Sequence, residues 1–260
     1  MFRFRLSVIL FCTLILFFGC DDPASDDPII ADIAIYARAG SWDASVTAVR
    51  AALESSGFSV ETITVEDILS DKIINFWLIL FPGGDSKEIT NALGPVGRMK
   101  VRTYISSGGG FVGLGGGAAI ADSSTGLWPG LGLFNGVADF PVDIIATPPA
   151  YTITSIRLIN SFHQIGRNGL EHYQTLYHGG PQFIFSGNEA IDVIYNYVTT
   201  GTPAAIAFQF GQGRVFLAGF QPEIEENNDR DDTNFGNELV DADTEWDIID
   251  RAVKFCLWEN

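Results

Sequence analysis

The stretch Phe111-Val112-Gly113-Leu114-Gly115-Gly116-Gly117-Ala118-Ala119-Ile120 joins an apolar strand to a predicted helix through a run of glycines. A nucleophile elbow has this G-x-Nuc-x-G build: a strained turn aims one side chain at the sheet edge, and backbone N–H groups converge on an oxyanion. Gly113 and Gly117 hold the flanking positions, and Gly115 stands where the nucleophile belongs. Because glycine-rich turns are common in α/β proteins, the rest of the chain must decide whether this turn is an elbow.

The residues before this turn alternate between short apolar strands and helical spacing. Strands are predicted over 33–36, 58–64 and 76–81, and helices over 44–53 and 96–105. This order predicts a doubly wound, mainly parallel α/β sheet of the flavodoxin-like kind, with a ligand site at the carboxyl ends of the strands. Pro82-Gly83-Gly84-Asp85 also follows a strand, so its backbone amides and those of the elbow are expected to face one crevice.

The region after residue 125 has a different pattern, in which strands dominate. We predict strands over 151–159, 171–177, 182–185, 191–197, 204–210 and 214–220, separated by glycine-containing turns. A C-terminal amphipathic helix is predicted over 248–257. The strands are interpreted as added antiparallel structure within one domain that spans 31–260.

The N-terminus is typical of an export signal. Arg3 and Arg5 precede an apolar stretch over 6–18 that is too short to span a bilayer comfortably. Its end, Gly19-Cys20, resembles a bacterial lipoprotein signal, although Phe17 stands where leucine is usual. We expect a signal peptide over 1–19, a lipidated Cys20 with a linker over 20–30, and a lipid-anchored protein of the cell envelope. The alternative is an ordinary signal peptide or anchor with a chance cysteine.

Composition and charge exclude some function classes. The net charge of −17 becomes −19 when residues 1–19, with two arginines and no acid, are removed. Such a surface disfavours nucleic acid. No Walker A lysine is present, and the first strand is not followed by G-x-G-x-x-G, so no nucleotide cofactor is expected. Cys256 is the one cysteine left in the folded body, and its place in an amphipathic helix indicates a buried structural thiol.

Many of the acidic residues lie in the segment 223–247. The run 229–234 lacks the glycine and the glutamate that a calcium loop requires at its sixth and twelfth positions. We interpret the segment as a solvated acidic loop. No metal site is predicted, since His163 and His172 are nine residues apart without a third ligand at a suitable spacing.

Four motifs in this order carry a family resemblance: Phe81-Pro82-Gly83-Gly84-Asp85, the elbow at 113–118, Tyr177-His178-Gly179-Gly180-Pro181, and the run 213–223 that ends in Gln221-Pro222-Glu223. Together they resemble the class I glutamine amidotransferase-like fold and are most similar to its biotin-protein-ligase N-terminal-like branch, over roughly 31–258. Active members of that fold carry a cysteine at the elbow, activated by a histidine that a glutamate orients. The resemblance places these roles at Gly115, Gln221 and Glu223, so only the glutamate is kept.

The resemblance therefore implies a catalytically degenerate domain, or pseudoenzyme, that keeps a binding crevice. The expected pocket comprises Gly83, Gly84, Asp85, Gly115, Gly116, His178, Gln221 and Glu223. Its ligand would be a small carboxylate, an amide or a peptide end. Two alternatives stay open: a hydrolase or transferase with a site of its own around His178 and Glu223, and an envelope interaction protein that uses the acidic segment as a docking surface. The hydroxyls nearest the elbow, Ser123 and Ser124, are expected to face elsewhere.

Overall fold

A computed structural model describes residues 32–122, 129–187, 190–241 and 244–258. The predicted signal peptide, Cys20 and its linker, and Ser123 and Ser124 lie outside the described residues. None of the helices in the described ranges is long and apolar enough to cross a bilayer.

The centre of the fold is a nine-stranded sheet in the order β2-β1-β3-β4-β11-β10-β9-β6-β7. Its parallel half contains β1 (Ile33–Tyr36), β2 (Val60–Ile63), β3 (Leu78–Phe81), β4 (Gly110–Leu114) and β11 (Gly213–Ala218). All residues of β1, β3 and β4 are buried, as expected for parallel strands covered on both faces. The predicted α/β class and the strand ends that carry the glycine loops are confirmed.

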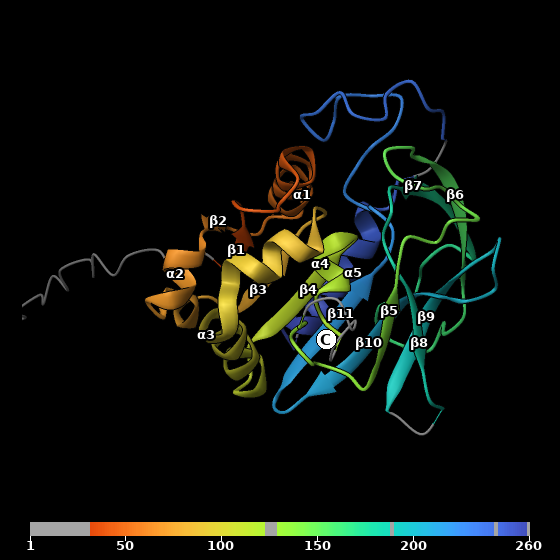
Figure 1. The fold of residues 1–260 in the computed structure, drawn as a ribbon. Coiled ribbons are helices and arrows are strands. Elements are labelled where there is room, and N and C mark those ends of the chain that lie inside the picture. The colour runs from red at the N-terminus through yellow and green to blue at the C-terminus, as the bar shows by residue number, and fades with distance from the viewer. Residues whose placement is uncertain (1–31, 123–128, 188–189, 242–243, 259–260) are drawn as a thin grey trace, which may run out of the picture.

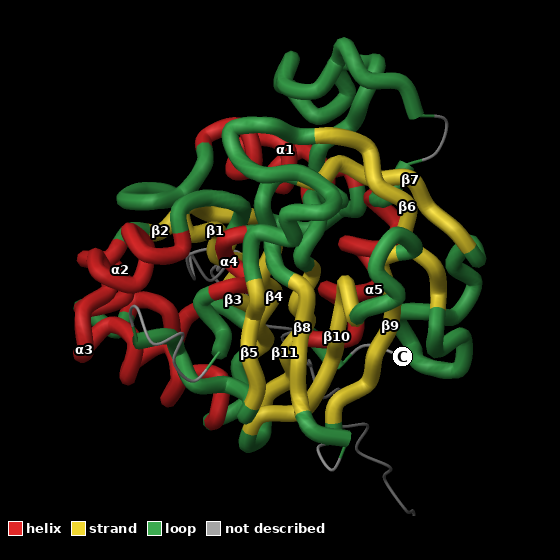
Figure 2. Tube along the Cα trace, turned by 45° about the vertical axis from the view of Figure 1, so that its right-hand side comes forward, coloured by secondary structure: helices red, strands yellow, loops and turns green. Residues whose placement is uncertain are grey.

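The antiparallel half continues the same sheet from β11. It adds β10 (Pro203–Phe210), β9 (Ile191–Tyr197), β6 (Thr152–Leu158) and β7 (His172–Tyr177). A separate two-stranded sheet pairs β5 (Gly136–Asp139) with β8 (Gln182–Phe185), and β8 packs against β10 (Figures 1 and 2). The predicted antiparallel strands are therefore present, with β8 outside the main sheet.

Two apolar clusters cover the two faces of the sheet. One contains side chains of α1 (Asp43–Ser55) and α5 (Trp246–Cys256), packed on residues of β1 such as Ile33 and Ile35. The other contains side chains of α3 (Ser86–Ser106), packed on the alternate residues Ala34 and Tyr36. The alternation of side chains along each strand thus supplies both cores.

The predicted helix over 96–105 is the second part of a longer element. Helix α3 begins at Ser86, where the Asp85 side chain accepts a hydrogen bond from the Glu88 N–H at 3.0 Å. Gly94 has non-helical dihedral angles, and Pro95 follows it inside the helix, so the apolar spacing is interrupted there. Three short elements are present that the sequence did not predict: α2 (Val65–Leu69), the 3₁₀ helix η1 (Lys72–Asn75) and β5. Helix α4 (Gly116–Ala119) follows the elbow directly.

Candidate functional site

The glycine loops that follow β3, β4, β7 and β11 converge at the carboxyl ends of the parallel strands. A Cβ atom added to Gly116 would lie 1.9 Å from the Gly84 carbonyl oxygen, and one added to Gly180 would lie 3.1 Å from the Gly115 Cα. The loops approach so closely that only glycine fits at these two positions. All four motifs of the sequence analysis therefore meet at one place.

The backbone at Gly115 has the strained conformation of an elbow. Its φ is +50° and its ψ is −116°, a combination that residues with a side chain rarely adopt. The Gly115 N–H donates to the Ala218 carbonyl at 2.8 Å, and the Gly117 N–H donates to the Pro82 carbonyl at 3.1 Å. These two bonds fix the turn against β11 and against the loop that follows β3.

Gln221 faces the elbow from the loop after β11. Its side-chain Oε1 accepts a hydrogen bond from the His178 backbone N–H at 2.9 Å, which directs the Nε2 amide toward the elbow. A Cβ atom on Gly115 would lie 2.4 Å from that Nε2. Gln221 thus fills the space that a nucleophile's side chain would need, and it is 1% exposed.

Glu223 makes a different contact from the one that the resemblance implies. The carboxylate is fully buried, and its Oε1 accepts a hydrogen bond from the hydroxyl of Ser45 in α1. That hydroxyl in turn accepts the Gly83 N–H at 2.8 Å. Within the described ranges no hydrogen bond joins Glu223 to Gln221. Glu223 therefore holds the loop after β3 through Ser45. This role of Ser45 is not predicted above, because its only signal in the sequence is a serine on the apolar side of α1.

The environment of Glu223 disfavours the charged form. Its Oε2 has no hydrogen-bond partner within the described residues. Burial, and to a lesser extent the nearby Asp231, raise the pKa of Glu223 to about 7.

A cavity of about 450 Å³ opens beside the elbow. Its lining includes Gly84, Asp85, Gly116, His178 and Gln221, so most of the predicted pocket residues share one cavity. In the described part of the chain neither the Gly84 N–H nor the Gly116 N–H has a hydrogen-bond partner. The first residues of α3 also line the cavity, and the positive end of the helix dipole favours a negatively charged group there.

Two further cavities, of about 530 and 550 Å³, lie around Trp77. They are slightly larger than the one at the elbow, but Asp32, Trp77 and Gly109 stand just before β1, β3 and β4. These cavities therefore lie at the amino ends of the strands, whereas ligands of open α/β sheets bind at the carboxyl ends. We take the cavity at the elbow as the candidate site.

His178 is half-buried among aromatic rings. It stacks on Phe235 with ring centroids 5.6 Å apart and meets Trp42 and Tyr151 edge-on at 5.3 and 5.7 Å. Burial lowers the pKa of this histidine, which favours the neutral imidazole. No hydrogen bond or ion pair between His178 and Glu223 occurs in the described residues, so these two side chains do not form the constellation that the alternative site requires.

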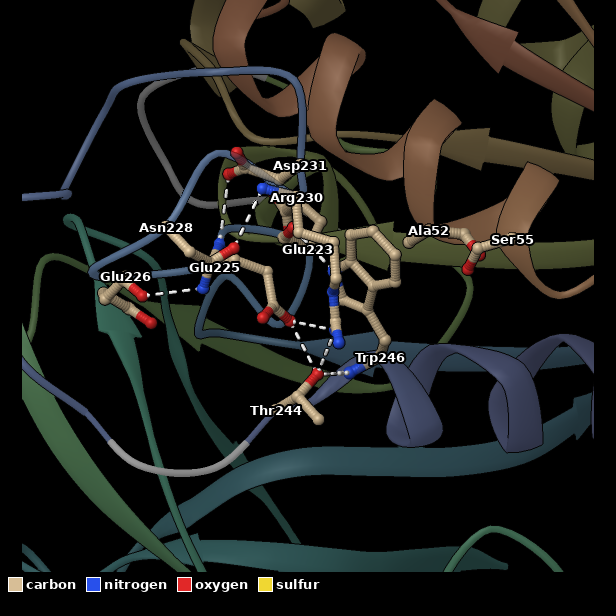
Figure 3. A network of polar contacts seen from close by, with 10 residues as sticks. All are labelled: Ala52, Ser55, Glu223, Glu225, Glu226, Asn228, Arg230, Asp231, Thr244 and Trp246. Carbon is tan, nitrogen blue, oxygen red and sulfur yellow. Dashed lines mark hydrogen bonds and ion pairs between the residues drawn. The ribbon is translucent and has the colours of Figure 1, made fainter.

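The interpretation of 223–247 as a solvated loop is wrong for several of its acidic residues. Five carboxylates in this segment are buried: Glu223, Glu225, Glu226, Asp231 and Glu245. Several are satisfied locally, as Figure 3 shows for the Asp231 carboxylate, which accepts the Glu225 N–H at 3.0 Å. Glu225 pairs with Arg230 at 2.6 Å and accepts the Thr244 hydroxyl (Figure 3). A count of acidic residues does not reveal which of them fold back on the backbone.

The prediction for Cys256 is confirmed. Its side chain is 1% exposed, and the thiol donates to the Phe111 carbonyl at 3.4 Å. Burial raises the pKa of this thiol to about 12, so it is held protonated and unreactive. His163 and His172 do not share a group of metal-ligating side chains in the described residues; one such group does occur there, and it consists of Glu226, Asp241 and Glu245.

Comparison with known proteins supports the fold. No family model matches the sequence, and no curated protein matches it significantly. Among solved structures, the chain is similar to a candidate GMP synthase subunit from Thermoplasma acidophilum, with a TM-score of 0.56 and 16% identity over 87% of this chain and 94% of that one. It is also similar to a candidate ThuA-like protein from Bacteroides uniformis, with a TM-score of 0.56 and 14% identity over 86% and 90% of the two chains. Identities this low show the fold alone, which is class I glutamine amidotransferase-like.

Proposed function

We propose that this domain binds a small ligand through a carboxylate or amide oxygen and does not carry out thiol-based hydrolysis. One observation carries the proposal. Gly84 and Gly116, whose N–H groups have no partner among the described residues, and Gln221, whose side chain ends in an amide, line one cavity beside Gly115. Three hydrogen-bond donors at such a place suit an oxygen atom that carries negative charge.

The missing side chains argue against chemistry at this place. Glycine offers no nucleophile, and a glutamine amide does not exchange a proton near neutral pH as an imidazole does. The side chain of Gln221 is also fixed, because its Oε1 is occupied by the His178 N–H. What the site retains is the part of an acyl-transfer centre that binds oxygen.

The size and lining of the cavity suit a ligand of modest size. Its volume of about 450 Å³ lies within the range of small-molecule sites. Trp42 and Pro148 give it apolar walls, and Lys87 adds a positive charge at the start of α3. A ligand with a short apolar or peptide-like body and a carboxylate suits both the apolar walls and the positive charge.

We also propose that the mature chain is anchored in the cell envelope through lipid on Cys20. The support is the sequence Gly19-Cys20 after a short apolar stretch.

The finer assignment to the biotin-protein-ligase N-terminal-like branch rests on the four ordered motifs. Neither proposal affects the ligand chemistry at the elbow.

Ligand binding can be tested with the full chain in mild detergent. Calorimetric titration with short carboxylates, the matching primary amides and dipeptides is expected to find binding in at least one class. Gln221→Glu keeps the volume and the acceptor for the His178 N–H but replaces the Nε2 donor by a carboxylate oxygen, so binding of carboxylates is expected to fall at least tenfold. Gln212→Glu, the same change at an exposed position, serves as the control.

Two outcomes contradict the proposal. One is the absence of binding across all three classes, and the other is equal binding by Gln221→Glu and the control. Turnover of an amide or ester that is lost in His178→Ala favours the alternative of a hydrolase.

A further inference from the structure

Three carboxylates come together where the loop after β11 passes the start of α5. Glu226 lies in that loop, Asp241 lies near its end, and Glu245 occupies the N-cap position of α5. One oxygen of each lies within 4.8 Å of the other two. The cluster therefore joins the two ends of the segment 226–245.

The Glu226 side chain gives a second and separate indication of a ligand. It is only 6% exposed, yet its Oε1 has no hydrogen-bond partner among the described residues. The nearest arginine in the same segment, Arg230, is committed to Glu225 at 2.6 Å. A buried carboxylate with an unmet oxygen beside two other acids is costly without a cation.

We infer that Glu226, Asp241 and Glu245 form a binding site for a calcium ion. Carboxylate oxygens are the preferred ligands of Ca²⁺, and flexible loops accommodate its variable coordination. Mg²⁺ suits the cluster less well, because it demands near-ideal octahedral geometry and dehydrates reluctantly, so it is usually bound through one or two carboxylates and several waters and not through three carboxylates.

The ion would also fix one wall of the cavity at the elbow. The ligands bracket the segment 226–245, which carries Phe235, and Phe235 stacks on His178 in the cavity lining. The calcium site does not depend on the proposed ligand of that cavity, because none of its three carboxylates lines it. Binding of Ca²⁺ can therefore be tested by itself.

The test is calorimetric titration of the full chain, in mild detergent and after treatment with a chelator, with CaCl₂ and separately with MgCl₂. We expect one Ca²⁺ per chain, at least tenfold weaker binding of Mg²⁺, and a rise in melting temperature with Ca²⁺. Glu226→Gln, which keeps the shape and removes the charge, is expected to weaken Ca²⁺ binding at least tenfold. Glu238→Gln is the matched control, since Glu238 lies in the same segment, is exposed, and accepts a hydrogen bond from the Tyr151 hydroxyl outside the segment.

Absence of Ca²⁺ binding by the unmodified chain at millimolar concentration overturns the inference, whatever the variants do. Equal binding by Glu226→Gln and Glu238→Gln overturns it as well, because the ion would then sit elsewhere. If Glu226→Gln does not fold, Glu245→Gln takes its place with the same expected loss.

Discussion

Replacement of Gly115 by alanine measures how closely Gln221 fills the elbow. The new Cβ would lie 2.4 Å from the Gln221 Nε2, far inside van der Waals contact, so the glutamine must move. Movement breaks the hydrogen bond that its Oε1 accepts from the His178 N–H. The partly buried His178 N–H would then lack a partner, which costs about 1–3 kcal/mol. Alanine in the sparsely populated φ/ψ region of Gly115, which is not the left-handed helical one, adds about 1–3 kcal/mol of backbone strain.

We therefore expect Gly115→Ala to lower the free energy of unfolding by about 2–6 kcal/mol, measured by urea denaturation of the full chain in mild detergent. Gly57→Ala is the matched control. Gly57 also has a positive φ, +86°, but nothing lies within 4 Å of its added Cβ, so it reports backbone strain alone. We expect it to lose about 1–2 kcal/mol.

A double-mutant cycle separates the contact from the strain. Gln221→Ala alone also leaves the His178 N–H unpaired, so the double variant loses that bond only once. We expect the double variant to be more stable than the sum of the single changes predicts, by about 1–3 kcal/mol. If Gly115→Ala costs no more than Gly57→Ala, or if the effects of Gly115→Ala and Gln221→Ala are simply additive, Gln221 does not fill the space beside Gly115.

Three further predictions concern buried groups of the domain. Burial raises the pKa of Glu223 from 4.5 to about 7, so the native state holds this proton more tightly than the unfolded chain does. The stability it contributes is complete below about pH 4.5 and is lost as the pH rises through about 7; urea denaturation of Glu223→Gln should show up to about 3 kcal/mol less decline across that window. An equal decline in both proteins contradicts this. Ser45→Ala removes the link between Glu223 and the Gly83 N–H and is expected to cost about 2–4 kcal/mol in the same assay at pH 7, whereas a loss below 1 kcal/mol argues against that link. Because burial raises the pKa of Cys256 to about 12, alkylation of the native chain at pH 8, mapped by mass spectrometry, should leave it unmodified, and rapid alkylation refutes its assignment as a buried thiol.

The elements of the sheet could be predicted because their apolar runs end at clear turn residues. The run before Pro82 and the run before Gly115 each fill a strand that is buried on both faces. The first part of α3 could not be predicted in this way, because Gly94 and Pro95 interrupt its spacing. Tertiary contacts on both sides of the kink hold it helical, and spacing alone does not report such contacts.

The candidate site was only partly accessible from the sequence. The glycines and Gln221 could be placed together because loops at the carboxyl ends of neighbouring parallel strands meet. The role of Glu223 could not be predicted, since its partner Ser45 lies 178 residues away in α1. The buried acids of 223–247 were misinterpreted for the same reason: charge is local in the sequence, but burial depends on what packs against it.

The proposed function requires that the Gly84 and Gly116 N–H groups bind an oxygen of the ligand. The most direct test follows backbone amide resonances of the isotope-labelled full chain during titration with the best carboxylate of the calorimetric panel. We predict that the amide protons of Gly84 and Gly116 shift downfield with saturation at the calorimetric Kd, while that of Gly57, far from the cavity lining, does not move. Saturable binding that leaves both of these resonances unchanged contradicts the account.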